Sequence, residues 1–174
     1  MRKLFILSSL VALSTSVMAM DLEYFIGAGA ERGSINAHSS SIGSTDTKDT
    51  ALKLKAGVIM DKNHRISISR VGYTKNGQDI DLTALNYDYI IPFENKFSLL
   101  VGAHLGKAEY DTNGFNMDGA MYGAQAGALY DLTSNIQLET TFEYSKYNVD
   151  TDVNGTKIEL KHSTALYLGF NYKF

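Results

Sequence analysis

Seven ionisable side chains of this 174-residue chain fall on the polar side of segments in which apolar and polar residues alternate. They are Glu31, Lys53, Lys55, Asp88, His104, Glu139 and Glu143. An extended strand projects residues two or four positions apart to the same side, so the two lysines form one pair and the last two glutamates another. Charges sheltered from water must be paired with opposite charges. The set therefore predicts either a salt-bridged network that fills an interior or a polar path for small solutes.

No catalytic or cofactor site is expected from the sequence. The best candidate for nucleophilic catalysis is His162 with Ser163, near Glu159. Adjacent residues of a strand point to opposite sides, so His162 and Ser163 cannot form a dyad with each other. Four widely spaced histidines and no cysteine leave no pattern for a metal site, a reactive thiol or a disulfide. We therefore predict a protein that is not an enzyme and needs no cofactor.

Eight strand-like segments must position the charged side chains. Each alternates apolar and polar residues with a period of two, most clearly in 136–145 and 164–174. The predicted strands are 22–31, 50–60, 65–74, 80–91, 97–105, 122–130, 136–145 and 164–174. We interpret them as an all-β fold, an eight-stranded antiparallel up-and-down barrel. Because the interior of so narrow a barrel is filled by side chains, the salt-bridged network is favoured over the open path.

The connections predict a barrel with two unequal ends. Short turns lie near 61–64, 92–96 and 131–135. They alternate with a Ser/Thr-rich loop over 32–49 and with three segments that each contain Asn-Gly, a dipeptide suited to tight turns. Alternating short and longer connections are typical of up-and-down membrane barrels.

The third strand has an ambiguous pattern. Ile66 and Ile68 share one side, whereas Val71 and Tyr73 share the other. A bulge near Ser69 or Arg70 would reconcile the two halves, because one extra residue re-aims the side chains that follow. With this bulge, Tyr73 joins an aromatic girdle at one rim, and Arg70 becomes a further candidate for the interior.

Glycines indicate which face lies inside. Alternation alone fits a membrane barrel with its apolar face outward, and it also fits a soluble lipocalin-like binder with that face inward. The glycines of the strands share the polar face, where a narrow bore needs small residues between large ones. These glycines are Gly27, Gly29, Gly57, Gly102, Gly106, Gly123, Gly127 and Gly169. Outside the third strand the apolar face carries no charge, as a surface against lipid requires.

The first nineteen residues have the pattern of a secretory signal peptide. Arg2 and Lys3 precede the apolar run 4–13, and small residues stand before a cleavage point after Ala19. We therefore divide the chain into a signal peptide, 1–19, and one β-barrel domain, 20–174. Without Arg2 and Lys3 the chain keeps 14 basic residues against 19 acidic ones, a balance that argues against nucleic acid as a partner.

The leader, the eight alternating strands and the aromatic last strand together resemble the small Gram-negative outer-membrane proteins of the OmpA/OmpX/opacity type. The resemblance covers residues 20–174 as an architecture, and it implies an outer-membrane location with the longer connections outside the cell. It also implies an assembly signal that the outer-membrane assembly machinery reads. The residues of this signal would be Leu166, Leu168, Phe170, Tyr172 and Phe174. The chain stops at Phe174, so we expect no peptidoglycan-binding domain.

The sequence thus predicts a monomeric barrel whose partners are outer-membrane lipid, lipopolysaccharide and the assembly machinery. Its expected role is structural and interactive, through surface loops whose ligand the sequence does not identify. A narrow porin for ions or small solutes and the soluble lipocalin-like binder are the alternatives.

Overall fold

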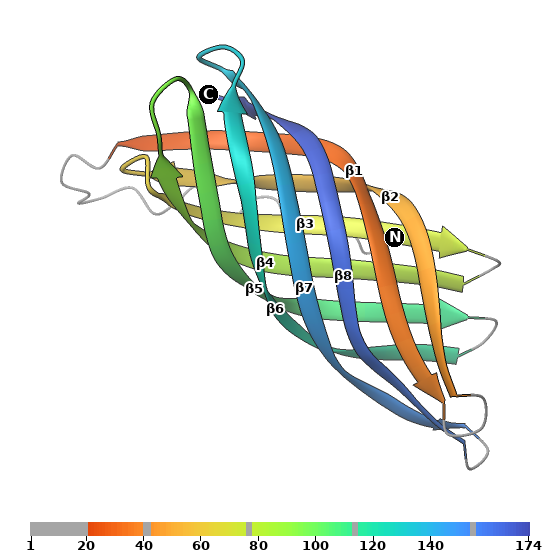
Figure 1. Ribbon diagram of the computed structural model, residues 1–174. Helices are drawn as coiled ribbons and strands as arrows, with labels where there is room; N and C mark the ends of the chain where they lie inside the picture. Colours follow the sequence, from red (N-terminus) through yellow and green to blue (C-terminus); the bar gives the residue numbers. More distant parts are fainter. Residues whose placement is uncertain (1–20, 40–42, 76–77, 113–114, 154–155) are drawn as a thin grey trace, which may run out of the picture.

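The structure, a computed structural model, describes residues 21–39, 43–75, 78–112, 115–153 and 156–174. The predicted signal peptide and the three Asn-Gly pairs lie outside the described residues. Eight antiparallel strands close into one barrel in chain order, with β1 paired to β8 (Figure 1). The strands are β1 (Leu22–Ser39), β2 (Gly43–Met60), β3 (His64–Lys75), β4 (Gln78–Pro92), β5 (Phe97–Thr112), β6 (Phe115–Asp131), β7 (Ile136–Val153) and β8 (Thr156–Lys173). The predicted eight-stranded up-and-down barrel is confirmed.

The described residues include no helix long and apolar enough to cross a membrane.

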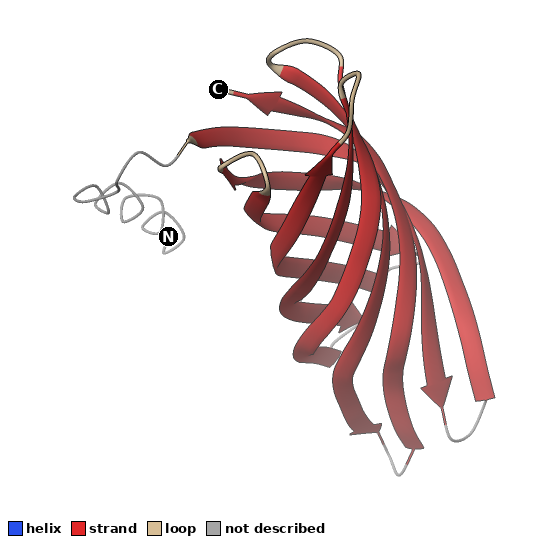
Figure 2. Cartoon of the chain, turned by 60° about the vertical axis from the view of Figure 1, so that its left-hand side comes forward, coloured by secondary structure: helices blue, strands red, loops and turns tan. Residues whose placement is uncertain are grey.

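One end of the barrel carries the short turns. Asp61 and Lys62 between β2 and β3, and Asn95 and Lys96 between β4 and β5, adopt positive φ values of 50° to 67°. This left-handed conformation reverses the chain within a few residues, and short polar side chains tolerate it best. Figure 2 shows the three described loops and the C-terminus together at this end. We call it the turn end.

At the opposite end, the predicted loop over 32–49 is wrong. β1 and β2 continue as paired strands through this region, from Arg32 opposite Thr50 to Ser39 opposite Gly43. Beyond the membrane, water can solvate both faces of a hairpin, so its side chains need not alternate between apolar and polar. The backbone ladder still pairs the amide and carbonyl groups. A Ser/Thr-rich composition therefore did not distinguish a loop from an extended hairpin.

The extended hairpins divide this end of the barrel into two sheets. The pairing of β2 with β3 ends at Lys53 opposite Val71, and the pairing of β6 with β7 ends at Ala120 opposite Asn148. β7, β8, β1 and β2 remain paired with one another beyond these points, and so do β3 to β6. Figure 1 shows β7, β8, β1 and β2 curving away together from β3 to β6. We call these groups the β7–β2 sheet and the β3–β6 sheet.

The third strand contains no bulge in its described pairing. Its register with β2 and with β4 runs without a shift. Val71 and Tyr73 are therefore buried inside, while Arg70 points outward and pairs with Asp81 at 3.3 Å. The predicted bulge, the interior Arg70 and the placement of Tyr73 in a girdle are all wrong. The pattern misled because the interior is polar only at mid-height, so β3 carries inward polar residues first and inward apolar residues after them.

The outer surface is an apolar belt. Large hydrophobic side chains of every strand are exposed on it, among them Leu54, Ile68, Leu105, Phe142 and Leu168 at 53% to 63%. The charged side chains of the barrel centre lie on the other face, inside. This arrangement fits lipid outside and contradicts the lipocalin-like alternative, which needs the apolar face inside.

Candidate functional site

The barrel interior centres on the carboxylate of Glu139, which is fully buried. Lys55 donates a hydrogen bond to its Oε1 at 2.8 Å, and Arg65 donates to Oε2 and Oε1 at 2.8 and 3.1 Å. Thr141 and Asn171 donate two more, at 2.9 and 2.8 Å. Two cations and two neutral donors therefore share one carboxylate, which replaces the water that the charge would otherwise bind.

A second centre is the ammonium of Lys53. It lies 2.6 Å from Oε2 of Glu31 and 2.6 Å from Oε1 of Glu143. Tyr73, on β3, donates its hydroxyl to the other oxygen of Glu31 at 2.5 Å. Four strands thus meet at this point, and strands β1 and β7 are held together by the lysine between them.

A third centre joins Asp88 to the rest. Arg65 donates its Nε to Asp88 at 2.9 Å, and Gln125 donates to the other carboxylate oxygen. The ammonium of Lys55 also lies 4.1 Å from the ring centroid of Tyr167, within the range of a cation–π contact. Arg65 bridges Asp88 and Glu139, so this centre and the Glu139 centre form one connected network.

The structure places all seven predicted interior residues inside the barrel. Six of them form ion pairs with interior partners, whereas His104 makes a hydrogen bond to Ser145 at 2.8 Å. Lys53 and Lys55 face Glu143 and Glu139 across the bore, a contact that the sequence could not establish.

Sequence reasoning missed Arg65, which links two carboxylates and is 1% exposed. It also missed the hydroxyl of Tyr73 and the amide of Gln125. The signal for Arg65 was present, because it shares one side of β3 with Ser67 and Ser69, opposite the isoleucines. Taking Ile66 and Ile68 as the outward residues would have placed Arg65 inside.

Two apolar layers enclose the network along the bore. The layer near the turn end lies closer to the turns than the charged residues of the same strands do. It consists of Phe25, Ile59, Ile90, Leu100 and Leu129. The layer toward the hairpins contains Ala84, Ala108, Met121 and Tyr147, with Ile80 and Leu82 packed against them. The ionic network therefore lies in a closed compartment.

The cavity within this compartment is small. It has a volume of about 20 Å³ and is lined by Glu31, Lys53, Tyr73, His104 and Glu143 among others. This space suits about one water molecule. Close packing continues at the backbone: a Cβ on Gly169 would lie 2.5 Å from Cζ of Tyr167, so glycine makes room for the ring there.

The interior offers no catalytic geometry among the described residues. His104 and Ser145 form a histidine–serine pair, but no carboxylate accepts a hydrogen bond from Nδ1 of the ring. The adjoining cavity has no room for a substrate. His162 and Ser163 do point to opposite sides: Ser163 is buried and bonds Tyr147 at 2.6 Å, and His162 stacks on Tyr144 outside.

Comparison with known proteins finds structural relatives only. No protein-family model and no curated protein matches the chain. Among solved structures, Neisserial surface protein A has a TM-score of 0.69 and 20% identity, over 87% of this chain and 97% of that one. OprG from Pseudomonas aeruginosa has a TM-score of 0.61 and 13% identity, over 87% and 95%. Ail from Yersinia pestis has a TM-score of 0.53 and 17% identity, over 88% and 99%.

These identities establish the fold and leave the role open. OprG is an outer-membrane protein, and the outer-membrane location predicted from the sequence agrees with these neighbours. The apolar belt and the charged interior give the same result from the chain's own residues. By its fold, the chain belongs with the eight-stranded transmembrane β-barrels of the outer membrane.

Proposed function

We propose that the chain is an integral outer-membrane barrel with an occluded interior, which stabilises the envelope and contacts other molecules through its extracellular hairpins. The observation that carries this proposal is the closed ionic network. Among the described residues, three cations and four carboxylates lie in the bore, and each is held by at least one interior partner. Apolar layers cover the network on both sides.

Passage of an ion through this bore would require several simultaneous changes. The permeating ion would have to displace Lys53 from Glu31 or Glu143, and it would leave a buried charge without its partner. It would also have to cross both apolar layers, whose mainly hydrophobic side chains replace little of its hydration shell. The side-chain packing therefore favours a plug over the porin alternative.

The extended hairpins support a role at the surface. Both the β7–β2 sheet and the β3–β6 sheet project strand residues beyond the closed part of the barrel. Rigid strands hold exposed side chains in fixed positions, which suits recognition. Ail, which has the same fold, has been solved in complex with the heparin analogue sucrose octasulfate.

Planar-bilayer recording tests the occluded interior. We expect the purified barrel to give no steady unitary currents. Steady currents that disappear in the charge reversal Glu143→Lys, but persist in Glu109→Lys at the exposed edge of β5, would support the porin instead. Location is tested separately by cell fractionation with a heat-modifiability gel, and recovery in the soluble periplasmic fraction would contradict the proposal.

A further inference from the structure

Carboxylates cover the outer side of the β3–β6 sheet just beyond the apolar belt. Three of them lie opposite one another on adjacent strands, because Asp81 pairs with Glu109 and Glu109 pairs with Asp118. One step further from the belt, Asp79 pairs with Asp111. Like charges directly opposite each other on one side destabilise a sheet. These five residues, which we call the acidic face, would therefore be stabilised by a cationic partner.

The cations of the same sheet neutralise only part of the acidic face. Among the described side chains they are Arg70 and Lys107, and their ion pairs of 2.8 to 3.3 Å all go to the three carboxylates nearest the belt. Asp79 and Asp111 are exposed and have no cationic partner among the described residues. On its described outer side, this sheet therefore carries more carboxylates than cations and is negative.

The outer side of the β7–β2 sheet has the opposite charge. Arg32 on β1 and Lys146 on β7 point outward, and Lys161 is exposed at a bulge of β8. None of the three has a carboxylate partner among the described residues. The described outward side chains of this sheet beyond the belt also include no carboxylate. We call these three residues the cationic face.

The two faces lie on opposite sides of the barrel. Its eight strands close in chain order, so β5 lies across the bore from β1, and β4 lies across from β8. The acidic face spans β4 to β6, whereas the cationic face spans β7, β8 and β1. The two faces therefore cannot meet within one molecule. A second copy that is shifted sideways without rotation brings its cationic face against the acidic face of the first.

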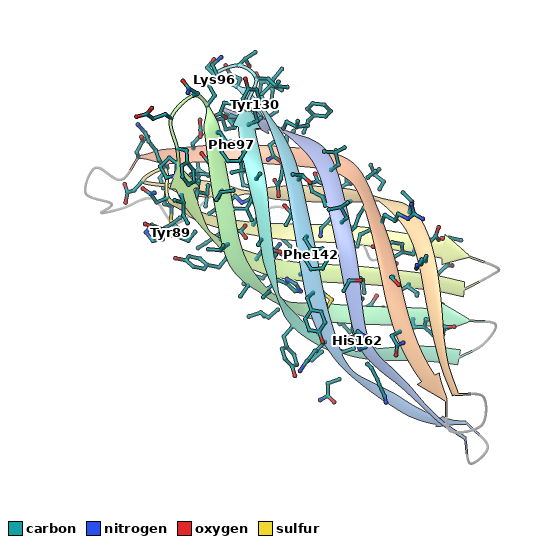
Figure 3. All side chains as sticks on the ribbon, in the orientation of Figure 1. Tyr89, Lys96, Phe97, Tyr130, Phe142 and His162 are labelled. Atoms are coloured by element: carbon teal, nitrogen blue, oxygen red, sulfur yellow. The ribbon has the colours of Figure 1, made fainter. Side chains whose placement is uncertain are left out.

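Both faces begin at the edge of the apolar belt. Along β5 the outward residues become charged after Leu105, and along β7 they become charged after Tyr144. Figure 3 shows the same order, with Phe142 in the belt and His162, which pairs with Lys146, nearer the hairpins. A membrane holds the belts of neighbouring barrels at one height. The acidic face of one barrel and the cationic face of the next would therefore stand level.

We propose that the acidic face of one barrel binds the cationic face of a second copy in the same membrane. Arg32 and Lys146 would pair with Asp79 and Asp111, the carboxylates that lack a partner in their own sheet. Each exposed ion pair is weak, but several act together here as a network. The contact uses a different surface on each partner, so it can continue as a row of barrels. This association goes beyond the monomer expected from the sequence.

Fluorescence energy transfer between labelled copies in phosphatidylcholine vesicles tests the contact. The chain has no cysteine, so Ser134→Cys at the turn end can carry a donor or an acceptor dye. The acidic-face variant is Asp79→Lys with Asp111→Lys, and the cationic-face variant is Arg32→Glu with Lys146→Glu. The parent should associate, and each variant alone should associate about tenfold less, because like charges then face each other across the contact.

Mixing the two variants tests the pairing itself. The acidic-face variant presents cations on both sides, and the cationic-face variant lacks them on both. An equimolar mixture should therefore associate as the parent does. A chain that carries all four changes should also associate, because opposite charges again face each other. Failure of both rescues would overturn the proposal.

Further arms exclude other causes. The matched control, Glu94→Lys with Lys62→Glu in the turns, should stay within about twofold of the parent, because exposed charges away from the contact contribute little. An equal loss in this control would overturn the proposal. Association that appears only after lipopolysaccharide and calcium are added would also overturn it, because lipid would then hold the barrels together.

Membrane insertion, on which the proposal rests, is tested separately by heat modifiability of every variant. A charge-reversal variant that does not fold is replaced by its neutral counterpart, Asp79→Asn with Asp111→Asn or Arg32→Gln with Lys146→Gln. These neutral variants should also associate less than the parent. Folded neutral variants that associate as the parent does would contradict the role of the two faces, while the barrel itself would still be inserted.

Discussion

Replacing Glu139 by glutamine should destabilise the barrel strongly. The change keeps the size of the side chain but removes the charge. Thr141 and Asn171 donate to different oxygens of Glu139, and glutamine has only one acceptor oxygen, so one of these two hydrogen bonds is lost as well. Arg65 keeps its ion pair with Asp88. Lys55 has no other ion pair among the described residues, so its ammonium would stay buried without a counter-charge.

The structure sets the size of this effect. The ammonium of Lys55 lies 2.8 Å from Glu139, which corresponds to about 6 kcal/mol of attraction at an effective dielectric constant of about 20. Rearrangement and water entry recover part of this energy, and broken buried pairs typically cost about 3–5 kcal/mol. We expect Glu139→Gln to lower the free energy of unfolding by about that amount. Adding Lys55→Met should restore most of it, because the orphaned charge is then gone.

Urea unfolding in lipid vesicles, followed by tyrosine fluorescence and by heat modifiability, measures the difference. The matched control is Glu109→Gln, which removes a carboxylate from the exposed pair with Lys107 and should change stability little because water screens that pair. The reasoning is refuted if Glu139→Gln changes stability no more than this control. It is also refuted if Lys55→Met makes the Glu139→Gln variant weaker still.

Three further predictions concern the belt, the third strand and the glycine-lined bore. Leu168→Arg places a charge in mid-belt and should cost about 2–4 kcal/mol, whereas Thr164→Arg, nearer the headgroups, should cost about 0–1 kcal/mol. Tyr73→Phe removes the hydroxyl that binds the carboxylate of Glu31 and should cost about 1–3 kcal/mol. Gly106→Ala adds a Cβ only 2.8 Å from Cα of Ala84, and the resulting overpacking should cost about 1–3 kcal/mol. The same unfolding experiment measures all three.

Each of these predictions has a control or a contrary outcome. Equal costs for the two arginine variants would show that the belt does not face lipid. If Tyr73→Phe leaves the free energy of unfolding unchanged, the ring of Tyr73 lies on the outer surface and not inside the barrel. For the glycine, Gly72→Ala is the matched control, because its added Cβ would meet only the movable carboxylate of Asp81. If both glycine variants lose a similar amount of stability, overpacking of the narrow bore is not the cause of the cost of Gly106→Ala.

The sequence predicted most of the fold because period-two alternation is a local property. Strands such as 136–145 keep that period over ten residues, and adjacent residues of a strand must face opposite sides. The alternating pattern is lost where the two faces of a strand stop differing in polarity. In β3 the interior changes from polar to apolar past Ser69, and in β1 beyond Arg32 both faces meet water. The same limit hid Arg65, whose strand gave two conflicting patterns.

The sequence by itself determined which side chains share a face, since that depends only on their spacing along an extended chain. Glu139 and Glu143 had to lie on one side of β7, and Lys53 and Lys55 on one side of β2. Only the tertiary structure decided which of them meet, because closure and stagger of the barrel bring β2, β3 and β7 together across the bore. Partners far apart in sequence are set by the three-dimensional path of the strands, which no local pattern records.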